Sequence, residues 1–270
     1  MNNIITNSLF ALGLINLTSC NLLSQDKKET KTPINPHEVG VYDTDLLPAS
    51  FHTDRREQLR NLMPDSSVAI FFSAPIRNRS NDVDFEYHQD PNFRYLTGLN
   101  EPHSLVIIYK HPTLFNGKLI KELLFVQPRD ANKELWLGKR LGVEGAKQIL
   151  EFEMVLPTTE FKSTNCKIDG TNYTYFPIDK NDTRDTRSKI DLFDLKKHFL
   201  TQTVRKTGSK NLARFMGLLR EIKTEEEMVF MRKAIDITCK SQTELMKKLT
   251  PQMAEYQTEA LVEYHFRNEG

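Results

Sequence analysis

Cysteine and tryptophan are scarce in this chain, whose 270 residues include three Cys and one Trp. Cys20, Cys166 and Cys239 lie far apart, and none belongs to a CxxC pair or to another spacing typical of zinc or redox sites. This excludes a disulfide-stapled scaffold. Cys166 and Cys239 would pair only if their backbones came within bonding reach; two separate buried thiols are the prediction.

An excess of charge of either sign is also lacking. The 37 basic and 36 acidic side chains nearly cancel, so no global field draws the chain to a nucleic acid or an anionic bilayer. With 39% hydrophobic and 27% charged residues, the chain is expected to be globular, with one packed domain and part of a second.

Local catalytic motifs are missing as well. The sequence contains no HExxH, no GxSxG, no P-loop and no GxGxxG after a strand, and its histidines are scattered. No internal repeat appears. No complete catalytic constellation is therefore expected within these residues: no catalytic residue and no metal ligand is assigned.

The amino terminus has the pattern of a targeting segment. Ile4 to Leu17 is mostly apolar, long enough for a signal h-region and too short to span a bilayer. Leu17 to Cys20 resembles a bacterial lipobox, which makes Cys20 a candidate for lipidation, although Met1 to Asn3 lacks Lys and Arg. We expect a signal peptide over 1–20, a polar tether over 21–50, and a secreted or periplasmic protein that reaches a membrane only through a lipid anchor. A cytoplasmic protein with a buried N-terminal helix is the alternative.

Candidate strands and helices alternate between residues 51 and 220. The expected strands are Ser67 to Ser73, Ser104 to Lys110, Leu119 to Gln127 and Tyr173 to Ile178, and the expected helices are Asp54 to Met63, Val143 to Phe152 and Lys189 to Leu200. Thr158 to Gly170 has no clear period and is expected to be a loop. Such alternation predicts an α/β domain built on a mixed sheet.

Residues 221–270 have a different pattern. Thr224 begins a capping box with Glu227, and apolar residues then recur at helical spacing as far as Leu249. Pro251 ends this helix, and a second helix starts near Glu255. Two helices cannot bury their own apolar stripes. We expect the chain to be the front part of a longer protein; packing of the two helices back onto the first domain is the alternative.

One polar row is a candidate metal site. Asp82, Asp84, Glu86 and His88 alternate with apolar residues, so on a strand they would share one face. Carboxylates with an imidazole suit a divalent cation, but side chains along one strand converge poorly. The prediction is therefore the solvated face of a half-buried strand.

The single Trp136 lies in the segment Glu134 to Gly142, a basic and apolar stretch bracketed by glycines that predicts a loop or strand edge. A lone Trp belongs to a core more often than to a ligand platform. Arg77 and Arg79 are possible anion contacts and, more simply, surface residues.

Taken together, three blocks resemble the aminopeptidase P family, also called Xaa-Pro aminopeptidases. Residues 79–82 (RSND) and 88–102 (HQDPNFRYLTGLNEP) are similar to the family's RS-x-D and RQ-x-x-x-F-x-YLTG-x-x-EP signature, with His88 where Arg is usual. Residues 125–130 (FVQPRD) and 134–142 (ELWLGKRLG) resemble its second block. Residues 221–234 and 251–256 resemble the opening of its pita-bread catalytic domain, with Gln252 in place of a common Gly.

The resemblance implies a mixed-sheet N-terminal domain over 51–220, followed by the first two helices of a pita-bread domain over 221–270. It implies a metallopeptidase that removes the N-terminal residue from peptides with proline second, using two manganese ions that activate a bridging water. In the family's order the two Asp, one His and two Glu ligands follow Gly270, so this chain alone is expected to be inactive. The family also implies that Trp136 reaches a neighbouring subunit's active site and that the protein is a dimer or tetramer.

Two alternatives remain. The protein is either the front half of a working Xaa-Pro aminopeptidase or a non-catalytic binding or oligomerisation module of the same family. A creatinase-like amidinohydrolase is a third possibility, disfavoured by the YLTG and EP signature.

Overall fold

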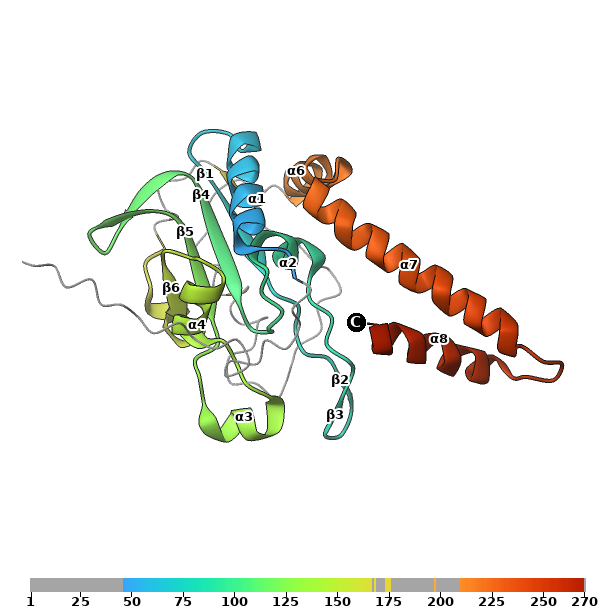
Figure 1. The fold of residues 1–270 in the computed structure, drawn as a ribbon. Helices are drawn as coiled ribbons and strands as arrows, with labels where there is room; N and C mark the ends of the chain where they lie inside the picture. Colours follow the sequence, from blue (N-terminus) through green and yellow to red (C-terminus); the bar gives the residue numbers. More distant parts are fainter. Residues whose placement is uncertain (1–45, 167, 169–172, 176–196, 198–208, 270) are drawn as a thin grey trace, which may run out of the picture. The chain divides into compact units, whose positions relative to one another are not determined.

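The fold was determined as a computed structural model that describes residues 46–166, 168, 173–175, 197 and 209–269 (Figure 1). The signal segment with Cys20 and most of the tether lie outside these residues, as does the helix expected at Lys189 to Leu200 apart from Lys197. The elements are α1 (Ala49–Leu62), β1 (Ser67–Phe72), β2 (Asn78–Ser80), β3 (Val83–Asp84), α2 (Pro91–Thr97), β4 (Leu105–Phe115), β5 (Lys118–Val126), α3 (Ala131–Leu137), α4 (Gly142–Ile149), β6 (Val155–Pro157), the 3-10 helix η2 (Thr158–Ser163), β7 (Tyr173–Tyr175), α6 (Ser209–Glu221), α7 (Glu225–Lys248) and α8 (Glu255–Glu269).

Five strands form one mixed sheet in the order β6-β5-β4-β1-β7. β4 pairs antiparallel with both β1 and β5, whereas β7 and β6 join β1 and β5 as parallel edge strands. The predicted α/β class with a mixed sheet is confirmed. The strand at Val155–Pro157 and the 3-10 turn that follows it were not predicted, because three residues are too few to show a period.

The hairpin of β4 and β5 is longer than its apolar runs suggested. Asn116 and Gly117 both adopt positive φ, 46° and 79°, as two-residue hairpin turns require. The pairing therefore runs to Phe115↔Lys118 at the turn, where Phe115 is buried in the same apolar cluster as Phe161.

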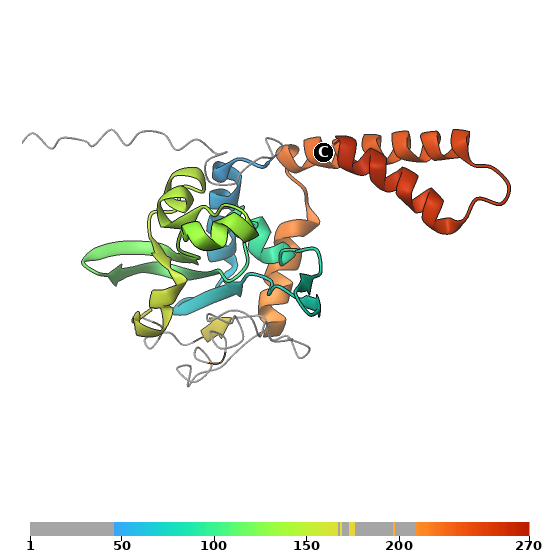
Figure 2. The same cartoon turned by 90° about the horizontal axis from the view of Figure 1, so that it is seen from below.

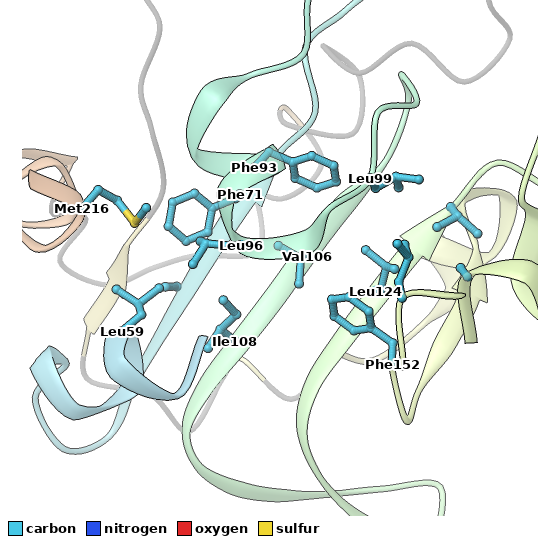
Figure 3. Close-up of a cluster of buried hydrophobic side chains, with 14 of the residues drawn as sticks. Leu59, Phe71, Phe93, Leu96, Leu99, Val106, Ile108, Leu124, Phe152 and Met216 are labelled. Atoms are coloured by element: carbon cyan, nitrogen blue, oxygen red, sulfur yellow. The ribbon is translucent and has the colours of Figure 1, made fainter. Parts of the chain in front are cut away.

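Both faces of the sheet are buried, because β1 is buried along its whole length and its side chains alternate between two apolar clusters. One cluster lies between the sheet and helices α1, α2, α4 and α6. Figure 3 shows Phe71, Val106 and Leu124 from neighbouring strands, with Leu59 of α1 and Met216 of α6 in the same cluster. On the other face Phe161 of η2 covers the sheet.

An ionic network joins α1 to β5 beneath this surface. Glu122 Oε2 accepts hydrogen bonds from Arg56 Nε and Arg60 Nη1, both at 2.9 Å, and Glu122 Oε1 forms an ion pair with Arg56 Nη2 at 2.8 Å. The Arg56 side chain is fully buried, and its guanidinium lies 4.0 Å from the centre of the Phe152 ring. Burial opposes ionisation of Glu122, but its bonds to the two arginines outweigh it and hold the pKa of Glu122 below its usual value.

Helices α7 and α8 form an antiparallel pair (Figure 2). The predicted capping box is confirmed: Glu227 N donates to Thr224 Oγ1 at 3.4 Å, and Thr224 N donates to Glu227 Oε2 at 2.9 Å. Among the described residues of this pair, several large apolar side chains remain exposed, including Met231, Ile235 and Tyr256. None of the helices described has the length and apolarity of a membrane span.

Candidate functional site

The first two of the three blocks that resemble the family meet next to helix α3, through the contact of Glu101 with Leu141. This helix carries three successive apolar side chains with most of their surface exposed: Leu135 at 80%, Trp136 at 89% and Leu137 at 63%. None of its residues is buried. Trp136 is therefore not a core residue, and the segment from Ala131 is a helix rather than the loop or strand edge expected.

The chain enters α3 through a polar cap. Asp130 accepts hydrogen bonds from Asn132 N at 3.1 Å and Lys133 N at 3.2 Å, which satisfies two free donors of the first turn. Arg129 then forms a two-pronged ion pair with Glu134, at 2.6 Å from Nε to Oε1 and 2.7 Å from Nη2 to Oε2. We call this pair the N-terminal anchor.

Both partners of the N-terminal anchor are stabilised in their charged forms. The hydrogen bond from Arg129 holds the pKa of the Glu134 carboxyl below its usual value, and the same bond raises the pKa of Arg129. Although Arg129 is half-exposed, the Glu134 side chain keeps only 8% of its surface accessible. The carboxylate is thus ionised and held against the segment that leads into α3.

A second contact fixes the chain after α3. Leu141 N donates to Glu101 Oε1 at 2.7 Å, and the Leu141 side chain enters the main core cluster. We call this contact the C-terminal anchor. The next residue, Gly142, has a φ of +62°, and a Cβ there would lie 2.6 Å from Arg129 Cγ. Glycine is required at this position because the backbone leaving α3 passes directly over the arginine of the N-terminal anchor.

Glu101 is the least satisfied carboxylate of the cluster. Burial raises its pKa to about 6, with the Leu141 amide and the charges of Arg140 and Arg129 acting in the opposite direction. Its Oε2 is buried and has no hydrogen-bond partner among the described residues.

Gln89 holds the backbone on which Glu101 stands. Its Oε1 accepts from Ala74 N at 2.8 Å and from Asp90 N at 2.9 Å, and its Nε2 donates to the carbonyl oxygens of Leu99, at 3.2 Å, and Glu101, at 2.9 Å. The glutamine of the first signature block therefore braces the Glu-Pro step at the end of that block.

The acidic row at Asp82 to His88 does not form a strand face. Only Val83–Asp84 is a strand, paired with Asn78–Ser80 in a separate two-stranded sheet. Val83 and Phe85, expected to be half-buried, are 52% and 55% exposed. The alternation is real, but the strands described here form only this two-stranded sheet, and of the three apolar side chains only Tyr87 is partly buried.

Metal ligands are likewise not gathered here. Over the described parts of the chain, no three His, Cys, Asp or Glu side chains are grouped so that they could hold an ion. The residues present therefore do not fit a manganese centre. Arg77 and Arg79 are surface residues, as the simpler prediction had it.

The two cysteines within the described residues are unpaired. Cys166 is a buried thiol and Cys239 is exposed on α7, so the prediction of two separate thiols is confirmed and that of burial holds only for Cys166. Burial raises the pKa of Cys166 to about 12.

The contacts among Glu101, Arg129, Glu134 and Leu141 were not predicted. Arg129 and Glu134 are five residues apart, a spacing with no fixed meaning in a loop, and Glu101 lies 40 residues before Leu141. Only the motif pattern, an acidic residue before Pro102 and another before Trp136, singled these positions out.

Comparisons with known proteins find the same family in sequence and in structure. Residues 52–173 match the family model "Aminopeptidase P, N-terminal domain". The Xaa-Pro aminopeptidase of Escherichia coli is 28% identical over 217 residues, which is 80% of this chain and 48% of that protein. The Xaa-Pro aminopeptidase 3 of Dictyostelium discoideum is 38% identical over 95 residues, 35% of this chain and 18% of that protein.

Solved structures agree. Escherichia coli aminopeptidase P with the inhibitor Pro-Leu superimposes with a TM-score of 0.67 at 25% identity, over 83% of this chain and 50% of that one. Proline aminopeptidase P II from Yersinia pestis gives a TM-score of 0.66 at 27% identity, over 83% of this chain and 51% of that one. The chain thus spans about half the length of the first relatives it matches.

Proposed function

We propose that this chain is the front half of an Xaa-Pro aminopeptidase, because residues 52–173 match the family model of the aminopeptidase P N-terminal domain. The complete polypeptide would remove the N-terminal residue from peptides whose second residue is proline. The observation that carries the proposal is the alignment of 80% of the chain with a protein named for that activity, together with the meeting of both signature blocks at α3.

The catalytic metals belong to the other half of the protein. When bound, two manganese ions would lower the pKa of a water molecule and polarise the scissile carbonyl. The described residues do not fit such a site, so we assign them no chemical step. Their part in the reaction would be to place side chains beside the substrate, and the isolated 270-residue chain should not hydrolyse Xaa-Pro peptides.

We assign Trp136 to substrate contact in a neighbouring subunit of a dimer or tetramer. An indole with 89% of its surface exposed offers a large apolar face at little cost in conformational entropy, which suits contact with a partner or a peptide. An isolated exposed Trp flanked by two exposed leucines is otherwise a solubility liability.

The test has two stages. Sequencing the coding DNA past the Gly270 codon should reveal an in-frame segment with two Asp, one His and two Glu in the family's order. An immediate stop codon would instead favour the non-catalytic module. In the complete enzyme, Trp136→Ala should raise KM for Xaa-Pro peptides or lower kcat/KM, whereas unchanged kinetics would refute the assignment of Trp136.

We further propose that the protein is exported and that Cys20 carries a lipid anchor. The support is the apolar run Ile4 to Leu17 followed by the lipobox-like Leu17 to Cys20. Metabolic labelling with a palmitate analogue should mark the wild-type protein and not Cys20→Ser. Absence of label from both would remove the lipoprotein assignment.

A further inference from the structure

Helix α3 lacks the buried apolar face that holds most helices in place. Most helices are held by an apolar face packed on a core, and α4, the next helix, follows that rule by burying Ala146. In α3 no residue is buried, and its three large apolar side chains are exposed. What holds it in place must therefore come from its flanks.

The flanks supply two polar contacts. Arg129, which precedes the helix, donates two hydrogen bonds of 2.6 and 2.7 Å to Glu134 of α3. After the helix, Leu141 N is held by Glu101 Oε1 at 2.7 Å. The α3 segment is thus held by two carboxylates, one from the helix itself and one from the preceding signature block.

We propose that Glu134 and Glu101 are positioning residues: Glu134 ties the middle of α3 to Arg129 before the helix, Glu101 holds the chain after the helix, and together they fix where the Trp136 indole stands. Neither carboxylate needs to touch a substrate to do this. The bearing of this arrangement on peptide hydrolysis rests on the proposed function, but the mechanical claim does not.

The claim can be tested without activity, since Trp136 is the only tryptophan in the chain. Its fluorescence reports on α3 and on nothing else. Time-resolved anisotropy separates the nanosecond swinging of a loop-borne segment from the slower tumbling of the whole protein. The 270-residue chain would be measured as wild type and as Glu134→Ala, Arg129→Ala and the double variant.

Glu134→Ala is a sharp perturbation because alanine is the strongest helix former. A change in Trp136 motion would therefore not reflect a weaker helix. The matched control is Glu244→Ala, which removes an ion pair of similar length, 2.7 Å to Lys247, from α7.

We expect the population with mobile α3 to rise roughly fivefold in Glu134→Ala and in Arg129→Ala, the order expected for loss of a two-pronged surface pair. The double variant should show no further increase, because both substitutions remove the same contact. Glu244→Ala should match wild type. An unchanged anisotropy decay in Glu134→Ala, with wild-type circular dichroism, would overturn the proposal for Glu134.

Glu101 is tested by a conservative pair. Gln at this position keeps a carbonyl oxygen that accepts from Leu141 N, whereas Ala removes it. Glu101→Gln should retain the wild-type decay and Glu101→Ala should gain the mobile component. Equal behaviour of the two variants would overturn the role of Glu101 as an acceptor.

Failure of the two proposals can be told apart. If Trp136→Ala leaves peptide hydrolysis by the complete enzyme unchanged while Glu134→Ala still mobilises the indole, the function assigned to Trp136 fails and the positioning role stands. If Trp136→Ala impairs hydrolysis while Glu134→Ala leaves the indole immobile, the positioning role fails and the assigned function stands.

Discussion

Replacing Glu122 by Gln should destabilise the domain strongly. The carboxylate accepts one hydrogen bond of 2.9 Å from each of two guanidinium groups and forms a further ion pair of 2.8 Å with Arg56 Nη2. Arg56 is fully buried and Arg60 keeps 6% of its side-chain surface, so neither can recover its lost partner from water. Breaking a buried ion pair from one side costs about 3 to 5 kcal/mol. For a domain whose free energy of unfolding is about 5 kcal/mol, the lower end of the common range, that is more than half of its stability.

The control variant, Glu57→Gln, makes the same Glu-to-Gln replacement in another partner of Arg60, but at an exposed position. Glu57 also pairs with Arg60, at 2.8 Å, but its side chain is 45% exposed, and Glu57→Gln should cost no more than about 1 kcal/mol. Urea unfolding followed by far-ultraviolet circular dichroism gives both values. Exposed Trp136 is a poor probe for this purpose.

The pH dependence checks the same idea in the wild type. The folded-state pKa of Glu122 is lowered, so its contribution to stability is present above the unfolded-state pKa and is lost as the pH falls through the folded-state value. The difference in free energy of unfolding between wild type and Glu122→Gln should therefore decrease as the pH falls through that interval. A cost below about 1 kcal/mol at neutral pH would refute the reasoning, because it would mean that the two guanidinium groups do not need the charge.

Three further predictions concern the site and the thiols. Burial raises the pKa of Glu101 in the folded state from 4.5 to about 6. The protonated carboxyl therefore stabilises the folded state below pH 4.5, and this stabilisation is lost as the pH rises through 6. Glu101→Gln should therefore gain about 2 kcal/mol of relative stability between those values, and an unfolding free-energy difference that does not vary with pH would contradict this. Gly142→Ala should cost about 1 to 3 kcal/mol in urea unfolding, since φ is +62° and the new Cβ meets the arginine of the N-terminal anchor. Gly217→Ala, in a helix with open space around it, should instead be neutral or stabilising by up to about 1 kcal/mol, and equal costs would refute the steric account. A thiolate-specific reagent, mapped by mass spectrometry, should label exposed Cys239 in the native chain and spare Cys166, whose pKa burial raises to about 12; equal labelling would contradict this.

Elements with a local cause were predictable from the sequence. The capping box at Thr224 places the start of α7 within one residue, because both of its hydrogen bonds lie inside four consecutive residues. β1 was predicted from a continuous apolar run because both faces of the sheet bury it. The hairpin turn at Asn116 and Gly117 also has a local cause, although it was not predicted.

Elements that depend on distant partners were not predictable. Alternation at Asp82 to His88 has the right period for a strand, but a strand needs a neighbour, and the only one there is the short β2. The contact of Glu101 with Leu141 joins positions 40 residues apart. The resemblance to the family pointed to the positions around α3. The structure was needed to show that these residues form the N-terminal and C-terminal anchors.

The covering of α1 by α6 has a consequence for how the domain is made. Leu59 and Met63 share their apolar cluster with Leu212, Met216 and Leu219, which the ribosome adds about 150 residues later. The ribosome synthesises about 5 to 20 residues per second. That face of α1 therefore stays exposed for on the order of ten seconds before α6 has been synthesised. During this time the growing chain displays part of an uncovered apolar face, a suitable target for chaperones that hold nascent polypeptides.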